Sequence, residues 1–278
     1  MTTETDTLTS AVHDRARDLL TSGHVHAVLG WRATGNGRRV QPALFAEEEV
    51  EHLVLEAEAN VNLGVYLTRP EVRRQFPVAL VARPADLRSV VVLIQEGQLE
   101  AEDVRAITMD PATGQLLPGD TVGDLLPWVR EHYPAGDFSD ELLDAVRETD
   151  SLSPPERWRY WNEQFSRCIR CYACREACPL CYCERCIVDQ GQPPWLEPSA
   201  HQRGNLNWNL MRAYHLAGRC TLCGACESAC PVNIPLMALN RMLARHVWEE
   251  FDYAPGLDPD TSALLSSWAL DDSSELFR

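Results

Sequence analysis

The sequence predicts an N-terminal α/β domain followed by a mainly helical domain that is organised around cysteine-rich loops. Short valine-rich segments alternate with helical patterns over the first half, and all eleven cysteines lie between Cys168 and Cys230. A chain of 278 residues that is 45% hydrophobic can form two domains with separate cores. We expect these domains at residues 1–150 and 151–253, and an acidic C-terminal arm at residues 254–278.

The first half alternates between helix and strand patterns. The pattern predicts helices at residues 8–20, 46–59 and 85–97. The signals are apolar residues at helical spacing, acidic residues in the first turn, or a glycine at the C-terminal end. Alternating or valine-rich segments predict strands at residues 24–31, 40–45, 77–82 and 104–109, with a turn at residues 34–37. Because a strand, a helix and a strand follow one another from residue 77 to 109, we expect a parallel crossover connection there.

Helical patterns predominate in the second half. They predict helices at residues 122–132, 140–148, 156–165, 207–218 and 234–251, and one short helix in the C-terminal arm. The two prolines in residues 151–156 suit a linker or a helix N-terminus, so we place the domain boundary near Ser151. The cysteine-rich segments are thus flanked by helices, which favours an α-helical ferredoxin-like module over a small β-rich one.

Charge and composition exclude several function classes. The formal net charge is −16, and residues 1–150 carry 13 Arg against 26 Asp and Glu. We expect no nucleic-acid partner, because phosphate binding needs clustered cations. The chain has no lysine, which excludes Schiff-base chemistry on lysine and a P-loop lysine. No glycine-rich phosphate loop follows a strand, and no nucleophile-and-base pattern is evident.

The sequence predicts a protein of a reducing compartment that does not span a membrane. The longest apolar run, Val90–Ile94, is far shorter than the roughly 20 residues of a membrane-spanning helix. The polar, acidic N-terminus does not have the pattern of a secretory signal. The cysteines have ligand spacing rather than the pattern of a disulfide framework. We therefore expect a cytoplasmic location.

Two cysteine blocks share the spacing C-x2-C-x2-C-x3-C-P. Iron in a cubane cluster binds four thiolates, and this spacing lets one tight loop supply three of them. In two-cluster ferredoxins the last cysteine of each run ligates the cluster of the other run. The sequence therefore predicts two [4Fe–4S] clusters. Their ligands would be Cys168, Cys171, Cys174 and Cys230 for one cluster, and Cys220, Cys223, Cys226 and Cys178 for the other. The competing interpretations are a pair of zinc sites or clusters with a purely structural role.

Three further cysteines, Cys181, Cys183 and Cys186, follow the first block directly. Three interpretations remain open for them. They could be thiols without a ligand role, a zinc site completed by a histidine such as His201 or His215, or ligands of an additional iron–sulfur centre. A third cubane would need a fourth thiolate that the remaining cysteines cannot supply.

Arginines and aromatic residues accompany the cysteine blocks. The arginines are Arg167, Arg170, Arg175, Arg185 and Arg219. Cations near a negatively charged cluster would stabilise its reduced state. Alternatively, these arginines form a solvated face or a face that docks another subunit. The aromatic residues are expected to pack in the core and shield the clusters; they are Trp158, Tyr160, Trp161, Phe165 and Tyr172.

The two blocks resemble those of two-cluster electron-transfer proteins encoded with heterodisulfide reductases, formate dehydrogenases and hydrogenases. The residues that carry this resemblance are RCIRCYACREACPLCYCERC and HLAGRCTLCGACESACPVNIPL, within residues 155–253. The N-terminal half is similar to the beta subunit of deazaflavin-reducing hydrogenase and formate dehydrogenase through NVNLGVYL, VALVARPADLRSVVVLIQE and VRAIT. The resemblance implies clusters that exchange electrons with a flavin and with other metal centres of a larger complex.

We interpret the chain as an iron–sulfur electron-transfer subunit that relays electrons between flavin- or metal-containing oxidoreductase subunits and does no bond chemistry itself. Two alternatives remain open. In the first, the α/β domain binds FAD and the chain is an oxidoreductase acting on a deazaflavin or nicotinamide. The sequence departs from these relatives at Pro84 and Ala85, where they tend to carry Gly-Cys, and residues 1–167 contain no cysteine. In the second, the chain is an adaptor with mainly structural clusters and an acidic docking surface.

Overall fold

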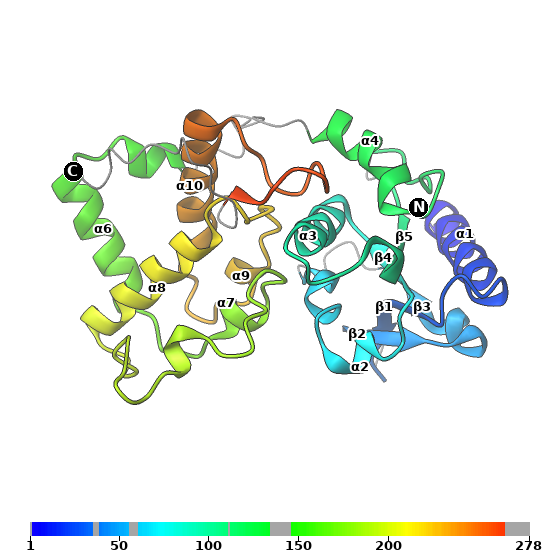
Figure 1. The fold of residues 1–278 in the computed structure, drawn as a ribbon, viewed down its shortest axis with the longest axis horizontal. Helices are drawn as coiled ribbons and strands as arrows, with labels where there is room; N and C mark the ends of the chain where they lie inside the picture. Colours follow the sequence, from blue (N-terminus) through cyan, green and yellow to red (C-terminus); the bar gives the residue numbers. More distant parts are fainter. Residues whose placement is uncertain (1, 36–38, 56–60, 111, 134–145, 265–278) are drawn as a thin grey trace.

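The structure is a computed structural model that describes the chain except for residues 1, 36–38, 56–60, 111, 134–145 and 265–278. Figure 1 shows a mixed sheet with helices on the right and a helical part on the left. We call the right-hand part, residues 2–133 where described, the sheet unit. The cysteine segments with their short helices α7 and α9 lie on the side of the helical part that faces the sheet unit (Figure 1).

Apart from the segment at residues 46–59, the described secondary structure follows the predicted order. The sheet unit contains α1 (Thr2–Thr21), β1 (Ala27–Ala33), β2 (Val40–Phe45), η1 (Glu47–His52), β3 (Leu53–Val54), η2 (Leu63–Tyr66), α2 (Pro70–Arg73), β4 (Val78–Ala82), α3 (Pro84–Gln95), η3 (Ala101–Asp103), β5 (Val104–Thr108) and α4 (Val122–His132). The helical part contains α6 (Pro154–Ser166), α7 (Ala173–Glu176), η4 (Ile187–Asp189), α8 (Gln202–Leu216), α9 (Ala225–Ser228) and α10 (Leu236–Phe251).

The sheet has the order β2-β1-β4-β5, with β3 paired to β1. Strand β1 runs antiparallel to β2 and β3 and parallel to β4. Strands β4 and β5 are parallel, with Val78 opposite Val104 and Ala82 opposite Thr108. The predicted crossover from residue 77 to 109 is therefore confirmed.

Strand β4 is buried on both faces of the sheet, which explains its uninterrupted apolar sequence. Successive side chains of a strand point to opposite faces. Val78 and Leu80 accordingly join the core that contains α3, and Ala79 and Val81 join the core that contains α1. Val12 of α1 is fully buried in that second core.

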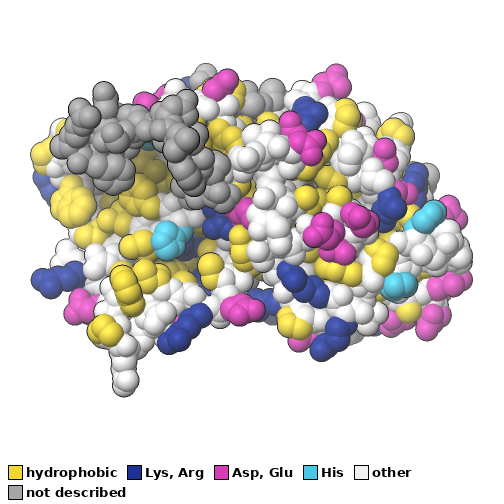
Figure 2. Space-filling view, in the orientation of Figure 1, with side chains coloured by type: hydrophobic (Ala, Val, Ile, Leu, Met, Phe, Trp, Pro, Cys, Tyr) yellow, Lys and Arg dark blue, Asp and Glu magenta, His cyan; other side chains and the backbone are white. Residues whose placement is uncertain are grey.

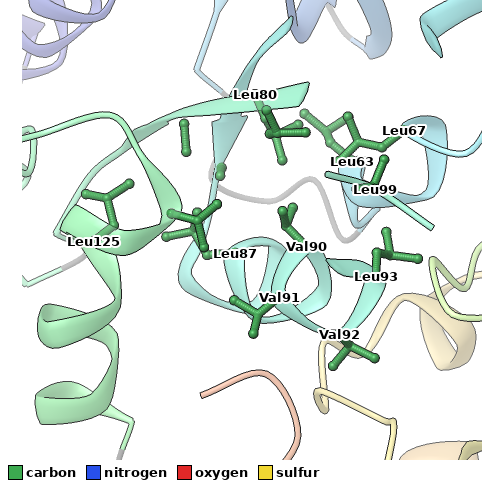
Figure 3. Close-up of a cluster of buried hydrophobic side chains, with 14 of the residues drawn as sticks. Leu63, Leu67, Leu80, Leu87, Val90, Val91, Val92, Leu93, Leu99 and Leu125 are labelled. Carbon is green, nitrogen blue, oxygen red and sulfur yellow. The ribbon is translucent and has the colours of Figure 1, made fainter. Parts of the chain in front are cut away.

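Helix α3 is also apolar on two sides. Figure 3 shows Leu87 and Val90 pointing toward Leu80 of the sheet, while Val91 and Val92 point away from it, toward the C-terminal half of the chain. The partners on that side belong to the same buried cluster; they are Leu180, Leu216 and Leu257. The sheet unit and the cysteine-bearing part therefore share one core.

Leu180 tests this shared core because it lies two residues after Cys178 yet is only 2% exposed. Removing a buried leucine side chain leaves a cavity, so Leu180→Ala is expected to destabilise the protein by about 2–5 kcal/mol. The measurement is the urea unfolding midpoint of the anaerobic protein. Trp195→Ala, which alters a 70% exposed side chain nearby in sequence, should shift the unfolding free energy by less than about 0.5 kcal/mol. Equal midpoints for the two variants would contradict a shared core.

The helix predicted for residues 46–59 is wrong. The acidic run begins the 3-10 turn η1, and Leu53–Val54 then form β3. Trp31 pairs with Val54 across the sheet, and Leu53 is 1% exposed. Backbone pairing with β1 and burial of Leu53 thus override the local helical pattern. The predicted helix at 140–148 and the C-terminal helix fall largely outside the described residues.

The described part of the predicted C-terminal arm packs against the sheet unit. Arg88 Nη2 donates to the Pro255 carbonyl at 2.8 Å. The side-chain amide of Gln95 donates to the carbonyls of Asp258 at 2.6 Å and Thr261 at 2.8 Å. This segment therefore lies across α3.

The surface charge follows the sequence division. Figure 2 shows acidic side chains concentrated over the right half of the molecule, where the sheet unit lies. Among the described helices, none has the length and hydropathy needed to cross a membrane.

Candidate iron–sulfur site

The two cysteine loops, Cys168–Cys178 and Cys220–Cys230, have the same backbone geometry. Arg170 and Leu222, which precede the second cysteine of each loop, both have φ of 58°. Tyr172 and Gly224, which follow that cysteine, have φ of 59° and 79°. Positive φ is uncommon for residues other than glycine. Because three of these four residues are not glycine, the two loops share an uncommon backbone shape.

A one-turn helix follows the positive-φ residues in each loop. Ala177 N donates to Ala173 O at 2.9 Å in the first loop, and Ala229 N donates to Ala225 O at 3.0 Å in the second. Turns that combine right- and left-handed residues direct successive backbone N–H groups into a concavity that binds anions, including iron–sulfur clusters. The loops therefore fit a negatively charged cluster in both shape and donor chemistry.

The first loop brings Cys174 close to the last cysteine of the second loop. The pKa of Cys174 is raised to about 11, mainly by burial; Arg212 opposes this rise, and the nearby Cys226, Cys168 and Cys230 contribute to it. Cys171 lies at the exposed edge of this loop. Cys230 accepts a hydrogen bond from Ile234 N, with 3.4 Å between nitrogen and sulfur.

The second loop is close to the last cysteine of the first. Burial raises the pKa of Cys220, and the thiols of Cys226, Cys223 and Cys178 act in the same direction. Burial also raises the pKa of Cys223 to about 11, with Cys178 again among its neighbours. Cys178 thus lies near the second loop, and Cys230 lies near Cys174 of the first loop. Metal binding would have to deprotonate these buried thiols.

Arg212 of α8 lies among the thiols and is only 4% exposed. Its Nη2 donates to the Cys174 carbonyl at 3.2 Å, and its Nε has no hydrogen-bond partner. Burial acts to lower the Arg212 pKa, but Cys226, Cys174 and Cys178 raise it above its usual value through the negative charge of their ionised forms. A buried cation with an unused donor fits a site that holds anionic clusters.

Three of the arginines singled out from the sequence have partners other than the cysteines. Arg170 donates to the Gly204 carbonyl at 2.6 Å, and Arg175 pairs with Asp189 at 3.1 Å. Arg219 pairs with Glu96 of α3, which joins the second loop to the sheet unit. Sequence reasoning missed Arg212. The signal that could have found it is a single charged residue within the apolar helical stretch at residues 207–218.

Two of the predicted aromatic residues cover the thiols, and one does not. Trp161 and Phe165 of α6 are 7% and 1% exposed and belong to the buried cluster against which Cys168 and Cys174 pack. Trp158 of the same helix is 57% exposed. Its predicted role in core packing is therefore wrong, because α6 turns this side chain toward solvent.

The two loops differ in exposure although their backbones match. Ile169 follows the first cysteine of the first loop and is 56% exposed, whereas its equivalent Thr221 is 3% exposed. Thr221 Oγ1 lies 2.8 Å from Ser89 Oγ of α3. The sheet unit thus covers the second loop and leaves this edge of the first loop open.

The three additional cysteines occupy different surroundings. A hydrogen bond with Cys181 raises the pKa of Cys178 well above its usual value, and burial of Cys178 acts in the same direction. Cys183 is exposed, and Cys186 N is bonded to Asp189 Oδ2 at 3.0 Å. Within the described residues, no group of three or more His, Cys, Asp or Glu side chains is packed tightly enough to hold a single metal ion. A cubane differs from such a site because each thiolate binds a different iron.

Comparisons with known proteins agree with this geometry. Residues 164–234 match the family model of a 4Fe–4S dicluster domain. The chain is 36% identical over 105 residues to the beta subunit of F420-dependent formate dehydrogenase from Methanocaldococcus jannaschii, a match that covers 37% of this chain and 26% of the relative. It is 35% identical over 111 residues to the beta subunit of F420-dependent formate dehydrogenase 1 from Methanococcus maripaludis, covering 38% and 26%.

These matches span about a quarter of the length of the two curated relatives. The match to the domain model contains all eight cysteines of the two loops. Residues 164–234 therefore form a 4Fe–4S dicluster domain, a module that holds two [4Fe–4S] clusters.

Proposed function

We propose that this chain is an electron-transfer subunit that relays electrons through two [4Fe–4S] clusters within a larger oxidoreductase complex. The observation that carries the proposal is the pair of cysteine loops with matching positive φ angles within the dicluster domain. Bound clusters supply one-electron redox steps, while the protein sets their spacing, potential and access. The similarity to beta subunits of formate dehydrogenases supports a place in a complex with flavin- or metal-containing subunits.

The ligand assignment that we propose is crossed between the loops. We call the set Cys168, Cys171, Cys174 and Cys230 the outer set, because its loop is partly exposed. We call the set Cys220, Cys223, Cys226 and Cys178 the inner set, because the sheet unit covers its loop. The proximities of Cys174 to Cys230 and of Cys220 to Cys178 support this assignment. We further propose that residues 151–253 form an α-helical ferredoxin-like domain.

Electrons would exchange with a protein partner at the open edge of the outer set. Tunnelling rates fall steeply with distance, so the exposed side chains of Ile169 and Cys171 mark the favourable point of approach. At the inner set, the contacts of Thr221 with Ser89 exclude a partner from the equivalent position. The sheet unit therefore leaves the outer set as the point of exchange with a partner.

Metal and flavin analysis of the anaerobically purified full-length protein tests the proposed function. We expect about eight irons and eight sulfides per chain, which is the content of two cubanes, and visible absorbance that is bleached by a one-electron viologen donor. EPR spectra of the reduced protein should show two interacting paramagnets. A folded protein with zinc in place of iron, or with iron that no low-potential donor reduces, would contradict the proposal.

Changing Ile169 tests the proposed point of approach. Ile169→Glu places a charge at the open edge and is expected to slow electron exchange with the co-purifying partner subunit by about tenfold or more, since a charge placed against an apolar contact disfavours docking. Reduction by the small viologen donor should be unchanged. Stopped-flow absorbance measures both rates. Phe251→Glu, at a 61% exposed apolar residue at the end of α10, is the matched control. Equal effects of the two variants would exclude Ile169 as the point of approach.

A further inference from the structure

Two buried side-chain amides lie against cysteines of the inner set. Asn240 of α10 is 3% exposed, and its Nδ2 lies 3.6 Å from Cys226 Sγ. Asn62 of the sheet unit is fully buried, and its side chain acts to lower the pKa of Cys223, against the larger effect of burial. These residues come from opposite ends of the chain and reach two different sulfur atoms.

Asn62 is fixed in place by a network of buried polar groups. Its Oδ1 accepts from Gly64 N at 2.9 Å, and its Nδ2 donates to Ser89 Oγ at 2.8 Å. Ser89 in turn contacts Thr221 Oγ1 at 2.8 Å, within the second loop. Each polar group of this network therefore has a partner, which holds the amide of Asn62 against the inner set.

The outer set has no equivalent pair of amide donors in the part of the chain that the structure describes. Among the described residues, no side-chain amide donates to a sulfur of the outer set. Asn205 is the buried asparagine nearest to that loop in the hydrogen-bond network, and it donates to the Cys168 carbonyl oxygen at 2.7 Å. Cys230 accepts only a backbone N–H, from Ile234. The loops thus share a backbone geometry but differ in the donors that reach their sulfur atoms.

Donors to sulfur affect the reduction potential of a cluster. Reduction adds negative charge that is spread onto the cysteine sulfurs, so N–H donors stabilise the reduced form and raise the potential. Burial acts in the opposite direction, because added charge is less stable away from water. The inner set is the more buried of the two, and its amides offset this loss of solvation.

We propose that Asn62 and Asn240 are potential-setting residues for the cluster of the inner set, and that they keep its potential within reach of the outer cluster. This inference rests on the proposed function, because it requires redox-active clusters. It assigns to the sheet unit a role in the redox properties of the dicluster domain, through Asn62. The two residues act through the sulfur ligands and are positioning residues, not catalytic ones.

Replacing each amide by leucine, which has a similar shape and no donor, tests the proposal. In Asn62→Leu and Asn240→Leu we expect the reduced form of the inner cluster to be disfavoured about tenfold, a shift of about 59 mV for a one-electron couple. The potential of the outer cluster should not change. EPR-monitored redox titration of the full-length protein measures both, and the signal that survives in Cys171→Ala identifies the inner cluster.

The matched control is Asn209→Leu. Asn209 is 3% exposed on α8, and its amide donates to the Asn205 carbonyl at 2.8 Å rather than to sulfur. This control should leave both potentials unchanged. Asn240→Gln retains an amide and should recover part of the shift that Asn240→Leu causes. If both leucine variants hold two clusters with unchanged potentials, the inference is overturned while the proposed function stands.

A measurement on the unmodified sequence covers the case in which the leucine variants do not fold. Protein labelled with 15N at the asparagine side chains should show nitrogen coupling to the inner cluster in pulsed EPR spectra, and none to the outer cluster. Absence of that coupling from a protein with two reducible clusters would also overturn the inference. A wild-type protein without reducible clusters would instead contradict the proposed function itself.

Discussion

Replacing Cys178 and Cys223 together by alanine is expected to remove one cluster, whereas replacing Cys178 and Cys171 together is expected to remove both. Crossed ligation places Cys178 with Cys223 on the inner set, so the first double variant damages a single cluster. The second damages one ligand of each cluster. Iron should fall from about eight to about four per chain in the first variant, and to near zero in the second, since each cubane holds four irons.

In uncrossed ligation, Cys178 would bind the same cluster as Cys171. The Cys178 and Cys171 double variant would then keep about four irons per chain, and the Cys178 and Cys223 double variant would keep almost none. Anaerobic iron and sulfide analysis distinguishes the two arrangements, and circular dichroism verifies that each variant retains its helices. Cys183→Ala is the control, since this thiol is exposed; about eight irons should remain. An iron content of about twelve in the unmodified protein would revive an additional centre that uses Cys181, Cys183 and Cys186.

Replacing Arg212 by methionine is expected to lower the potentials of both clusters and to weaken cluster retention. Arg212 is 4% exposed among thiols of both sets. A unit charge about 6 Å from a cluster, at an effective dielectric constant of about 20, contributes roughly 3 kcal/mol, which is on the order of 100 mV. Leaving buried anions without their cation should also destabilise the folded protein by about 3–5 kcal/mol.

Redox titration and the rate of iron release to a chelator measure these two effects. Arg203→Met is the matched control because Arg203 is exposed on the same helix α8. Arg212→Lys retains the charge and should preserve the potentials better than methionine does. Unchanged potentials in an iron-replete Arg212→Met protein would show that another group neutralises the clusters.

Much of the architecture could be predicted because it depends on local spacing. The apolar run from Val78 to Ala82 and the following helical pattern predicted the crossover that β4, α3 and β5 form. The spacing of the cysteines predicted two equivalent loops, and the matching φ angles at Arg170 and Leu222 agree with that prediction. Short-range pattern determines such features, since strand and loop geometry repeat over a few residues.

Features that depend on contacts between residues far apart in the sequence could not be predicted from local spacing. The segment around Leu53 has a helical pattern, but pairing with β1 makes it a strand. Asn62 and Cys223 are 161 positions apart in sequence, and no spacing rule joins them. Arg212 carried a detectable signal, as a lone charge in an apolar helix, but its thiol neighbours become evident only from the packing.

The burial of Leu180 has a consequence for how the protein is assembled. This side chain anchors the end of the first loop in the core beneath α3, so Cys178 is held near the second loop by packing as well as by any metal. Iron insertion would then complete a partly organised pocket, and cluster loss would be transmitted to the sheet through the same anchor. Oxidative damage to the cluster should consequently be detectable as increased protease susceptibility at α3, far from any cysteine in the sequence.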